Sequence, residues 1–232
     1  MAARLGGVLD MAAMDLPGHG RSPDWDRGHS LHDQATEMAG AVLAEGAWVV
    51  GHSFGATVAL RLALEGAPVA GLVLIEPVLF AAAREAGAPA HAQNAAAFAP
   101  VLAAFEAGEP ETAARLFVEQ WGDGRPWDRL PEAARAYQAG RIGLVFAQGP
   151  AIDDDAAALL APGRLEGLRV PVLLLEGDRS PPVVAAVQAR LAERMPQARR
   201  VVLEGAGHMA PLTHPGAVAG AIAAHLGTAR AP

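Results

Sequence analysis

The segment 51–55, Gly-His-Ser-Phe-Gly, matches the pattern Gly-x-Ser-x-Gly and offers the clearest chemistry in the sequence. An apolar run typical of a strand precedes it, and a helical run, Ala56–Leu64, follows it. Glycines relieve crowding in such a sharp turn, and the N-terminus of a helix favours negative charge on a reacting oxygen. The pattern therefore predicts that Ser53 is a nucleophile. An ordinary serine in a glycine-rich turn is the alternative.

A serine nucleophile needs a base for its proton and a carboxylate that orients the base. His208 ends the glycine-rich stretch Gly-Ala-Gly-His after one apolar run, and Asp178 follows another. Side chains at the carboxyl ends of neighbouring parallel strands converge on one crevice. Ser53, Asp178 and His208 also come in the chain order that such a serine turn requires, so we expect them to form a triad. Glu76, at the end of a further apolar run, is the alternative carboxylate.

Alternating strands and helices must position these side chains. Short apolar runs rich in Val, Leu and Ile predict buried strands at Val8–Met14, Ala47–Val50, Gly71–Ile75, Val170–Leu175 and Arg200–Leu203. Helical patterns lie between and after them, at Leu31–Ala44, Phe54–Leu64, Pro182–Met195 and Pro215–Leu226. This alternation predicts an α/β fold with a mostly parallel sheet and helices on both faces.

One long stretch has no convincing strand pattern. Residues 81–167 are alanine-rich and helical in pattern, and the stretch is too long for an ordinary loop. We expect a helical cap insertion there, over one edge of the sheet, with residues 1–80 and 168–232 forming the core. His52, Trp121 and Trp127 are candidates for a substrate pocket, although packing within the insertion would explain the two tryptophans equally well.

Composition excludes several classes of protein. The chain of 232 residues has no cysteine, and all 18 of its basic residues are arginines. Disulfides, thiolate nucleophiles, Cys-ligated zinc, P-loops and Schiff-base lysines are therefore excluded. The net charge of −7, without an arginine cluster, argues against a nucleic-acid partner. No uncharged apolar run is long enough to cross a membrane, and aspartates interrupt any signal peptide, so we expect a cytoplasmic protein with a small-molecule substrate.

No metal or other cofactor is expected. His29 and His32 lie at a predicted helix start and lack a third ligand nearby. The acidic run 153–155 could bind a cation. It also precedes a predicted short helix, Ala156–Leu160, whose dipole would favour the carboxylates without any metal.

Two further segments carry a resemblance to a known family. Residues 15–22 read Asp-Leu-Pro-Gly-His-Gly-Arg-Ser, and the histidine loop at 205–208 accompanies the serine turn. With these motifs the chain resembles the α/β-hydrolase fold family, close to its cap-bearing esterase and C–C hydrolase branch. The resemblance covers most of residues 8–80 and 168–226, and the insertion matches by position alone.

The resemblance assigns roles to the residues named above. It implies Ser53 as nucleophile, His208 as general base and acid, Asp178 as orienting carboxylate and the backbone N–H of Phe54 as an oxyanion donor. Family members normally carry three more strands before the Asp-Leu-Pro-Gly-His-Gly segment, and the third leads into a loop with the second oxyanion N–H. We therefore expect an N-terminally shortened fold in which Met1 is an internal start.

The sequence predicts a serine hydrolase that cleaves a small, fairly apolar carboxylic ester or related acyl bond through an acyl-enzyme. The same triad serves C–C hydrolysis, lyase chemistry and acyl transfer, which stay open together with the oligomeric state. The alternative is a non-catalytic or impaired ligand-binding protein of the same fold, because the second oxyanion loop is missing.

Overall fold

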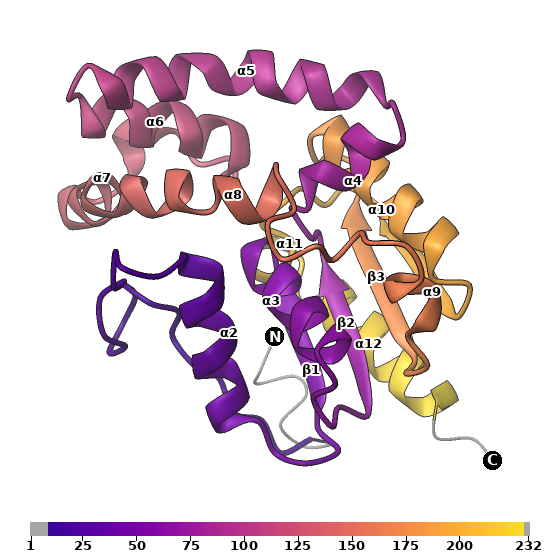
Figure 1. Cartoon of the computed structure of the whole chain (residues 1–232). Helices are drawn as coiled ribbons and strands as arrows, with labels where there is room; N and C mark the ends of the chain where they lie inside the picture. The colour runs from indigo at the N-terminus through magenta and orange to yellow at the C-terminus, as the bar shows by residue number, and fades with distance from the viewer. Residues whose placement is uncertain (1–8, 230–232) are drawn as a thin grey trace.

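Four parallel strands form one sheet in the computed structural model, which describes residues 9–229 (Figure 1). The strands are β1 (Trp48–His52), β2 (Gly71–Ile75), β3 (Val172–Gly177) and β4 (Ala198–Leu203). They are hydrogen-bonded in the order β1-β2-β3-β4, so the spatial order follows the chain. The predicted α/β class is confirmed, and the predicted strand at Gly71–Ile75 has the predicted bounds.

Helices connect the strands and cover the sheet. They are α2 (Leu31–Val42), α3 (Phe54–Leu64), α4 (Phe80–Glu85), α5 (Pro89–Glu106), α6 (Pro110–Trp121), the 3₁₀ turn η1 (Trp127–Arg129), α7 (Glu132–Ala147), α8 (Gly149–Ile152), α9 (Arg164–Gly167), α10 (Pro182–Arg194), α11 (Ala210–Thr213) and α12 (Pro215–Ala229). The side chain of Ser30 caps α2 by accepting a hydrogen bond from the N–H of Asp33.

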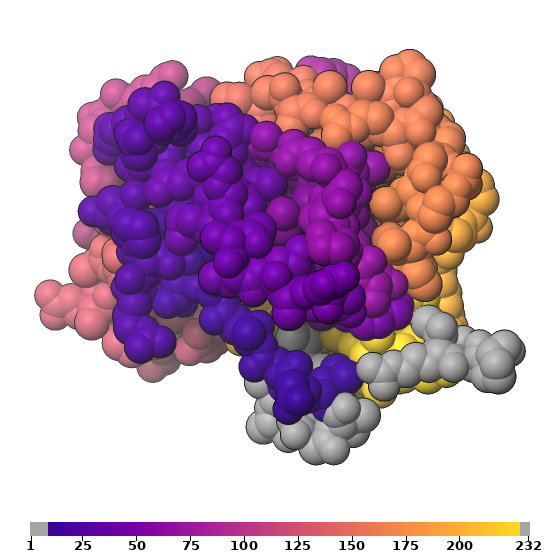
Figure 2. Space-filling model, turned by 60° about the horizontal axis from the view of Figure 1, so that its bottom comes forward, coloured from indigo at the N-terminus to yellow at the C-terminus, as the bar shows by residue number. Residues whose placement is uncertain are grey.

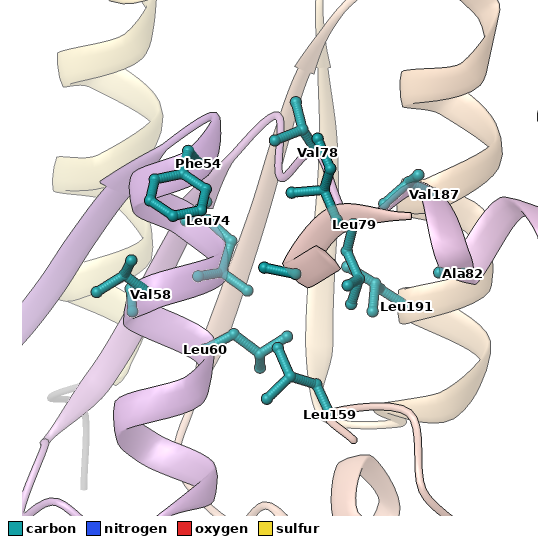
Figure 3. Close-up of a cluster of buried hydrophobic side chains, with 14 of the residues drawn as sticks. Phe54, Val58, Leu60, Leu74, Val78, Leu79, Ala82, Leu159, Val187 and Leu191 are labelled. Atoms are coloured by element: carbon teal, nitrogen blue, oxygen red, sulfur yellow. The ribbon is translucent and has the colours of Figure 1, made fainter. Parts of the chain in front are cut away.

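The two faces of the sheet carry separate apolar clusters, because successive side chains of a strand point to opposite faces. Leu72 and Leu74 of β2 belong to a cluster with α3 and α10, part of which is drawn in Figure 3. Val73 and Ile75 belong to a second cluster with α12. Both faces of the central strands are therefore buried, which explains why β2 and β3 read as continuous apolar runs.

The segment between β2 and β3 contains no strand and consists of helices joined by turns. Its helices α5, α6 and α7 pack against one another and form an apolar cluster of their own, which includes Val101, Trp127 and Ile142. Figure 1 shows these helices above the sheet. The first helix of the segment, α4, packs against α10 instead and is buried in the main core.

Two predicted elements are wrong. Residues 9–14 of the predicted strand Val8–Met14 are irregular in the described part of the chain, and Val8 lies outside it. The predicted helix at Ala156–Leu160 consists of turns instead. There the side chain of Asp155 accepts hydrogen bonds from the N–H groups of Leu159 and Leu160. Each of its two carboxylate oxygens therefore already has a backbone donor.

Among the described residues, 9–229, no helix is both long and apolar enough to span a membrane.

Candidate active site

The turn at Ser53 joins β1 to α3 in a strained conformation. Ser53 has φ 56° and ψ −123°, outside the regions that non-glycine residues normally adopt. Its N–H donates to the carbonyl oxygen of Ile75 at 2.9 Å, which fixes the turn against β2. Phe54 opens α3, so its backbone N–H belongs to the first turn of the helix, where amides have no partner within the helix.

The two glycines of the motif differ in the space around them. A Cβ added at Gly51 would lie 2.6 Å from the Cα of Ala56 and closer still to the carbonyl oxygen of Gly55. A Cβ added at Gly55 would meet nothing within 4 Å. Relief of crowding, which the motif suggests for both positions, is therefore required at Gly51 alone.

His208 lies beside the serine. Its Nε2 is 3.0 Å from Oγ of Ser53, although 155 residues separate the two in the chain. The imidazole is buried, and it sits at the end of the loop that follows β4. The sequence prediction that these two side chains meet agrees with this geometry.

The carboxylate beside His208 is Glu76 and not the expected Asp178. Oε2 of Glu76 is 2.7 Å from Nδ1 of His208, and the Glu76 side chain is completely buried. Its other oxygen accepts hydrogen bonds from the backbone N–H of Gly177 and from the hydroxyl of Ser180. Burial alone would raise the pKa of Glu76, but the hydrogen bonds and the charge of His208 hold it below its usual value.

Asp178 takes a structural position instead. Its side chain is exposed, and Oδ1 accepts a hydrogen bond from the N–H of Gly205 at 2.8 Å. Gly205 has φ 72°, so Asp178 supports the turn that leads into the histidine loop. Glu76 follows β2, which lies between β1 and β3, and the N–H of Gly177 at the end of β3 holds its carboxylate, whereas the Asp178 carboxylate is turned to the backbone of Gly205.

His52 supports the backbone of the histidine loop. Its Nε2 is 2.8 Å from the carbonyl oxygen of His208, and the two rings are 4.9 Å apart. Burial, together with the charge of His208, lowers the pKa of His52 to about 4. His52 is therefore neutral at pH 7, and Nε2 donates its proton to the His208 carbonyl.

The two tryptophans proposed for the substrate pocket lie in different places. The Trp121 ring packs edge-on against the ring of His208 at 4.8 Å and also contacts Phe80. Trp127 is buried inside the cluster of α5, α6 and α7. The structure thus brings Trp121 to the candidate site and places Trp127 in the interior of the insertion.

The arrangement suits transfer of a proton from serine to histidine. With Glu76 ionised, Nδ1–H of His208 donates to the carboxylate and Nε2 is left to accept the proton of Ser53. The serine oxygen lies at the N-terminus of α3, where partial positive charge favours an oxyanion. Within residues 9–229 no group of three or more His, Asp or Glu side chains could hold a metal ion.

The parallel sheet and the serine turn at the end of β1 are those of an α/β hydrolase. The model of the alpha/beta hydrolase family matches residues 1–221, so the chain belongs to this family and is an enzyme of the hydrolase class.

Individual relatives agree with this assignment. The chain is 26% identical over 216 residues to the N-formylmaleamate deformylase of Pseudomonas putida, a match that covers 91% of this chain and 76% of the relative. Its fold resembles that of MenH from S. aureus, with a TM-score of 0.67, 19% identity, and 94% of this chain and 83% of that chain covered. A hydrolase from Pseudomonas aeruginosa gives a TM-score of 0.63 with 25% identity, covering 92% of this chain and 78% of that one.

Proposed function

We propose that this hydrolase uses Ser53, His208 and Glu76 as a catalytic triad to cleave a small, fairly apolar ester or a related acyl bond. Ser53 attacks the carbonyl carbon while His208 takes its proton. His208 then gives the proton to the leaving group, and water releases the acyl-enzyme by the reverse sequence.

The observation that supports this proposal most directly is the continuous row of hydrogen-bonding contacts from serine to carboxylate. Ser53 Oγ, the two ring nitrogens of His208 and Glu76 Oε2 are separated by 3.0 Å and 2.7 Å. Each side chain comes from a different segment, and the carboxylate is buried and held by two further donors. Such a fixed carboxylate keeps the imidazole in the tautomer that accepts the serine proton.

The surroundings favour an apolar acyl group. Trp121 packs against His208, and Phe80 packs against Trp121, so the wall on that side of the imidazole is aromatic. The curated relative is named as a deformylase, an enzyme that removes an acyl group, which supports the reaction type. We propose further that the helical insertion, which supplies Trp121, acts as a cap over the site.

A fluorophosphonate probe tests the proposal, because it reacts with an activated serine. We expect labelling of the native chain, complete loss of labelling in Ser53→Ala and retention in the matched control Ser22→Ala. His208→Asn and Glu76→Gln should label much more slowly. A folded protein that the probe does not label would instead indicate a non-catalytic ligand-binding protein. A series of short-chain to medium-chain nitrophenyl esters would then define the acyl group.

A further inference from the structure

A cavity of about 580 Å³ lies between the N-terminal segment and the helical insertion. One wall comes from the N-terminal segment between residues 18 and 27, and the other from Phe105 of α5 and from residues of α7 between 140 and 144. Figure 2 shows the N-terminal segment (indigo) beside the pink surface of the insertion on this side of the molecule. None of the triad side chains lines this cavity, so it is separate from the immediate surroundings of Ser53.

Arg141 is held in place within the cavity wall. Its Nε donates to the carbonyl oxygen of Gly18 at 2.8 Å, and its guanidinium carbon lies 3.8 Å from the ring centroid of Tyr137. Neither terminal nitrogen of Arg141 has a hydrogen bond or ion pair in the described structure. A guanidinium that is fixed at one edge and stacked on a ring can present its free edge to a carboxylate without much loss of side-chain entropy.

The other residues that line the cavity determine which uncharged group a bound anion can carry. Trp25, Phe105 and Leu144 give the cavity apolar surfaces, and Arg27 lies 5.9 Å above the Trp25 ring as a second cation. Asp24 offsets one of the two arginines, so the lining carries one net positive charge. One net charge among apolar walls matches a monoanion with a hydrocarbon or aromatic body better than a phosphate dianion.

We propose that this cavity binds the carboxylate of a small amphiphilic acid, with the free edge of Arg141 as its principal ligand. The acid can be one end of the hydrolase substrate or a separate ligand. Leu144 relates the two locations, because it lines the cavity and also packs against the apolar cluster that contains Phe54 and Trp121. The insertion and the N-terminal segment would then be bridged by the bound acid as well as by the Arg141–Gly18 contact.

Calorimetric titration of the Ser53→Ala protein with 4-phenylbutyrate tests the proposal without any turnover. We expect binding of the acid, much weaker binding of the neutral 4-phenylbutanol, and a loss of about 10-fold to 100-fold in acid affinity in the double variant with Arg141→Gln. Arg129→Gln, an exposed arginine of the same insertion, is the matched control and should leave the affinity unchanged. Equal affinity for acid and alcohol, or acid binding that survives Arg141→Gln, would overturn the proposal.

A second measurement identifies the source of the carboxylate. If it belongs to the substrate, 4-phenylbutyrate should compete with a nitrophenyl ester in the native enzyme, and Arg141→Gln should abolish the competition. A separate ligand should bind with the same dependence on Arg141 and leave the KM for the ester unchanged. Both results support the cavity as a carboxylate site. Because the titration uses the Ser53→Ala protein, its result does not depend on the outcome of the fluorophosphonate experiment.

Discussion

Ser53 and Glu76 occupy equivalent positions at the ends of neighbouring strands. His52 pairs with Ile75 in the β1–β2 ladder, and each of the two functional residues comes directly after that pair. Both leave the sheet with positive φ, 56° for Ser53 and 49° for Glu76, although neither is glycine. Such backbone strain persists where the surrounding structure holds it. The N–H of Ser53 bonds to the carbonyl of Ile75, and the N–H of Glu76 bonds to that of Leu175, so adjacent strands hold both.

The first prediction separates the two candidate carboxylates. Glu76→Gln should lower kcat for a nitrophenyl ester by about 10³-fold to 10⁴-fold, because the imidazole loses the charge that fixes its tautomer. Asp178→Asn should change kcat by no more than about twofold, since that side chain is exposed and bonds to the turn at Gly205. Steady-state kinetics on both variants, with thermal melting to confirm folding, makes the comparison. A larger loss in Asp178→Asn would refute the assignment of Glu76.

The second prediction concerns the glycines of the serine turn. Gly51→Ala should lower the free energy of unfolding by at least about 1–3 kcal/mol, because the new methyl group meets the backbone of Gly55 and Ala56. Gly55→Ala should leave it unchanged or raise it by up to about 1 kcal/mol, since alanine favours the first turn of α3 and finds open space. Urea denaturation of the pair measures both values. Similar losses in the two variants would contradict the different surroundings of these glycines.

The third prediction is a pH dependence of stability that comes from His32. Burial, followed by the charge of Arg61, lowers the pKa of this histidine to about 4 in the folded protein. Between pH 6.5 and pH 4 the unfolded chain binds a proton that the folded chain does not. The contribution of His32 to the free energy of unfolding is therefore fully present above about pH 6.5. It falls by up to about 1.4 kcal/mol for each pH unit as the pH decreases toward 4.

Urea denaturation at several pH values measures this slope. His32→Leu should remove the His32 part of this slope across the same range and leave the part that comes from His52, whose pKa is also lowered to about 4. An unchanged slope in His32→Leu would show that the titration belongs to other groups.

Local sequence patterns predicted most of the elements, but not which carboxylate reaches the histidine. The helix Phe54–Leu64 and the strand Gly71–Ile75 could be predicted because their runs of apolar residues are visible in the sequence. Strand order alone does not make this choice, because β4, which leads to His208, pairs with β3 and not with β2. A glutamate directly after the apolar run nearest to the serine motif was the available signal. This signal carries weight only once the contacts of the histidine loop are known.

Contacts between distant segments were also not predicted from the sequence. The edge-on contact of Trp121 with His208 and the Arg141–Gly18 contact join parts of the chain whose local patterns say nothing of one another. The error at residues 9–14 has a related cause, since an apolar run forms a strand only where a neighbouring strand accepts its hydrogen bonds.

The last prediction compares Trp121 with Trp127, two buried tryptophans of the insertion in different surroundings. Phe substitution at either position should lower the melting temperature, because each ring fills a closed apolar cluster. Trp121→Phe alone should also reduce kcat/KM, by about 3-fold to 10-fold, since the shortened ring loses its edge contact with the imidazole of His208. Ester kinetics well below both melting temperatures separates the two effects. An equal loss of kcat/KM in Trp127→Phe would mean that the insertion acts on the site through its overall packing and not through the contact of one ring.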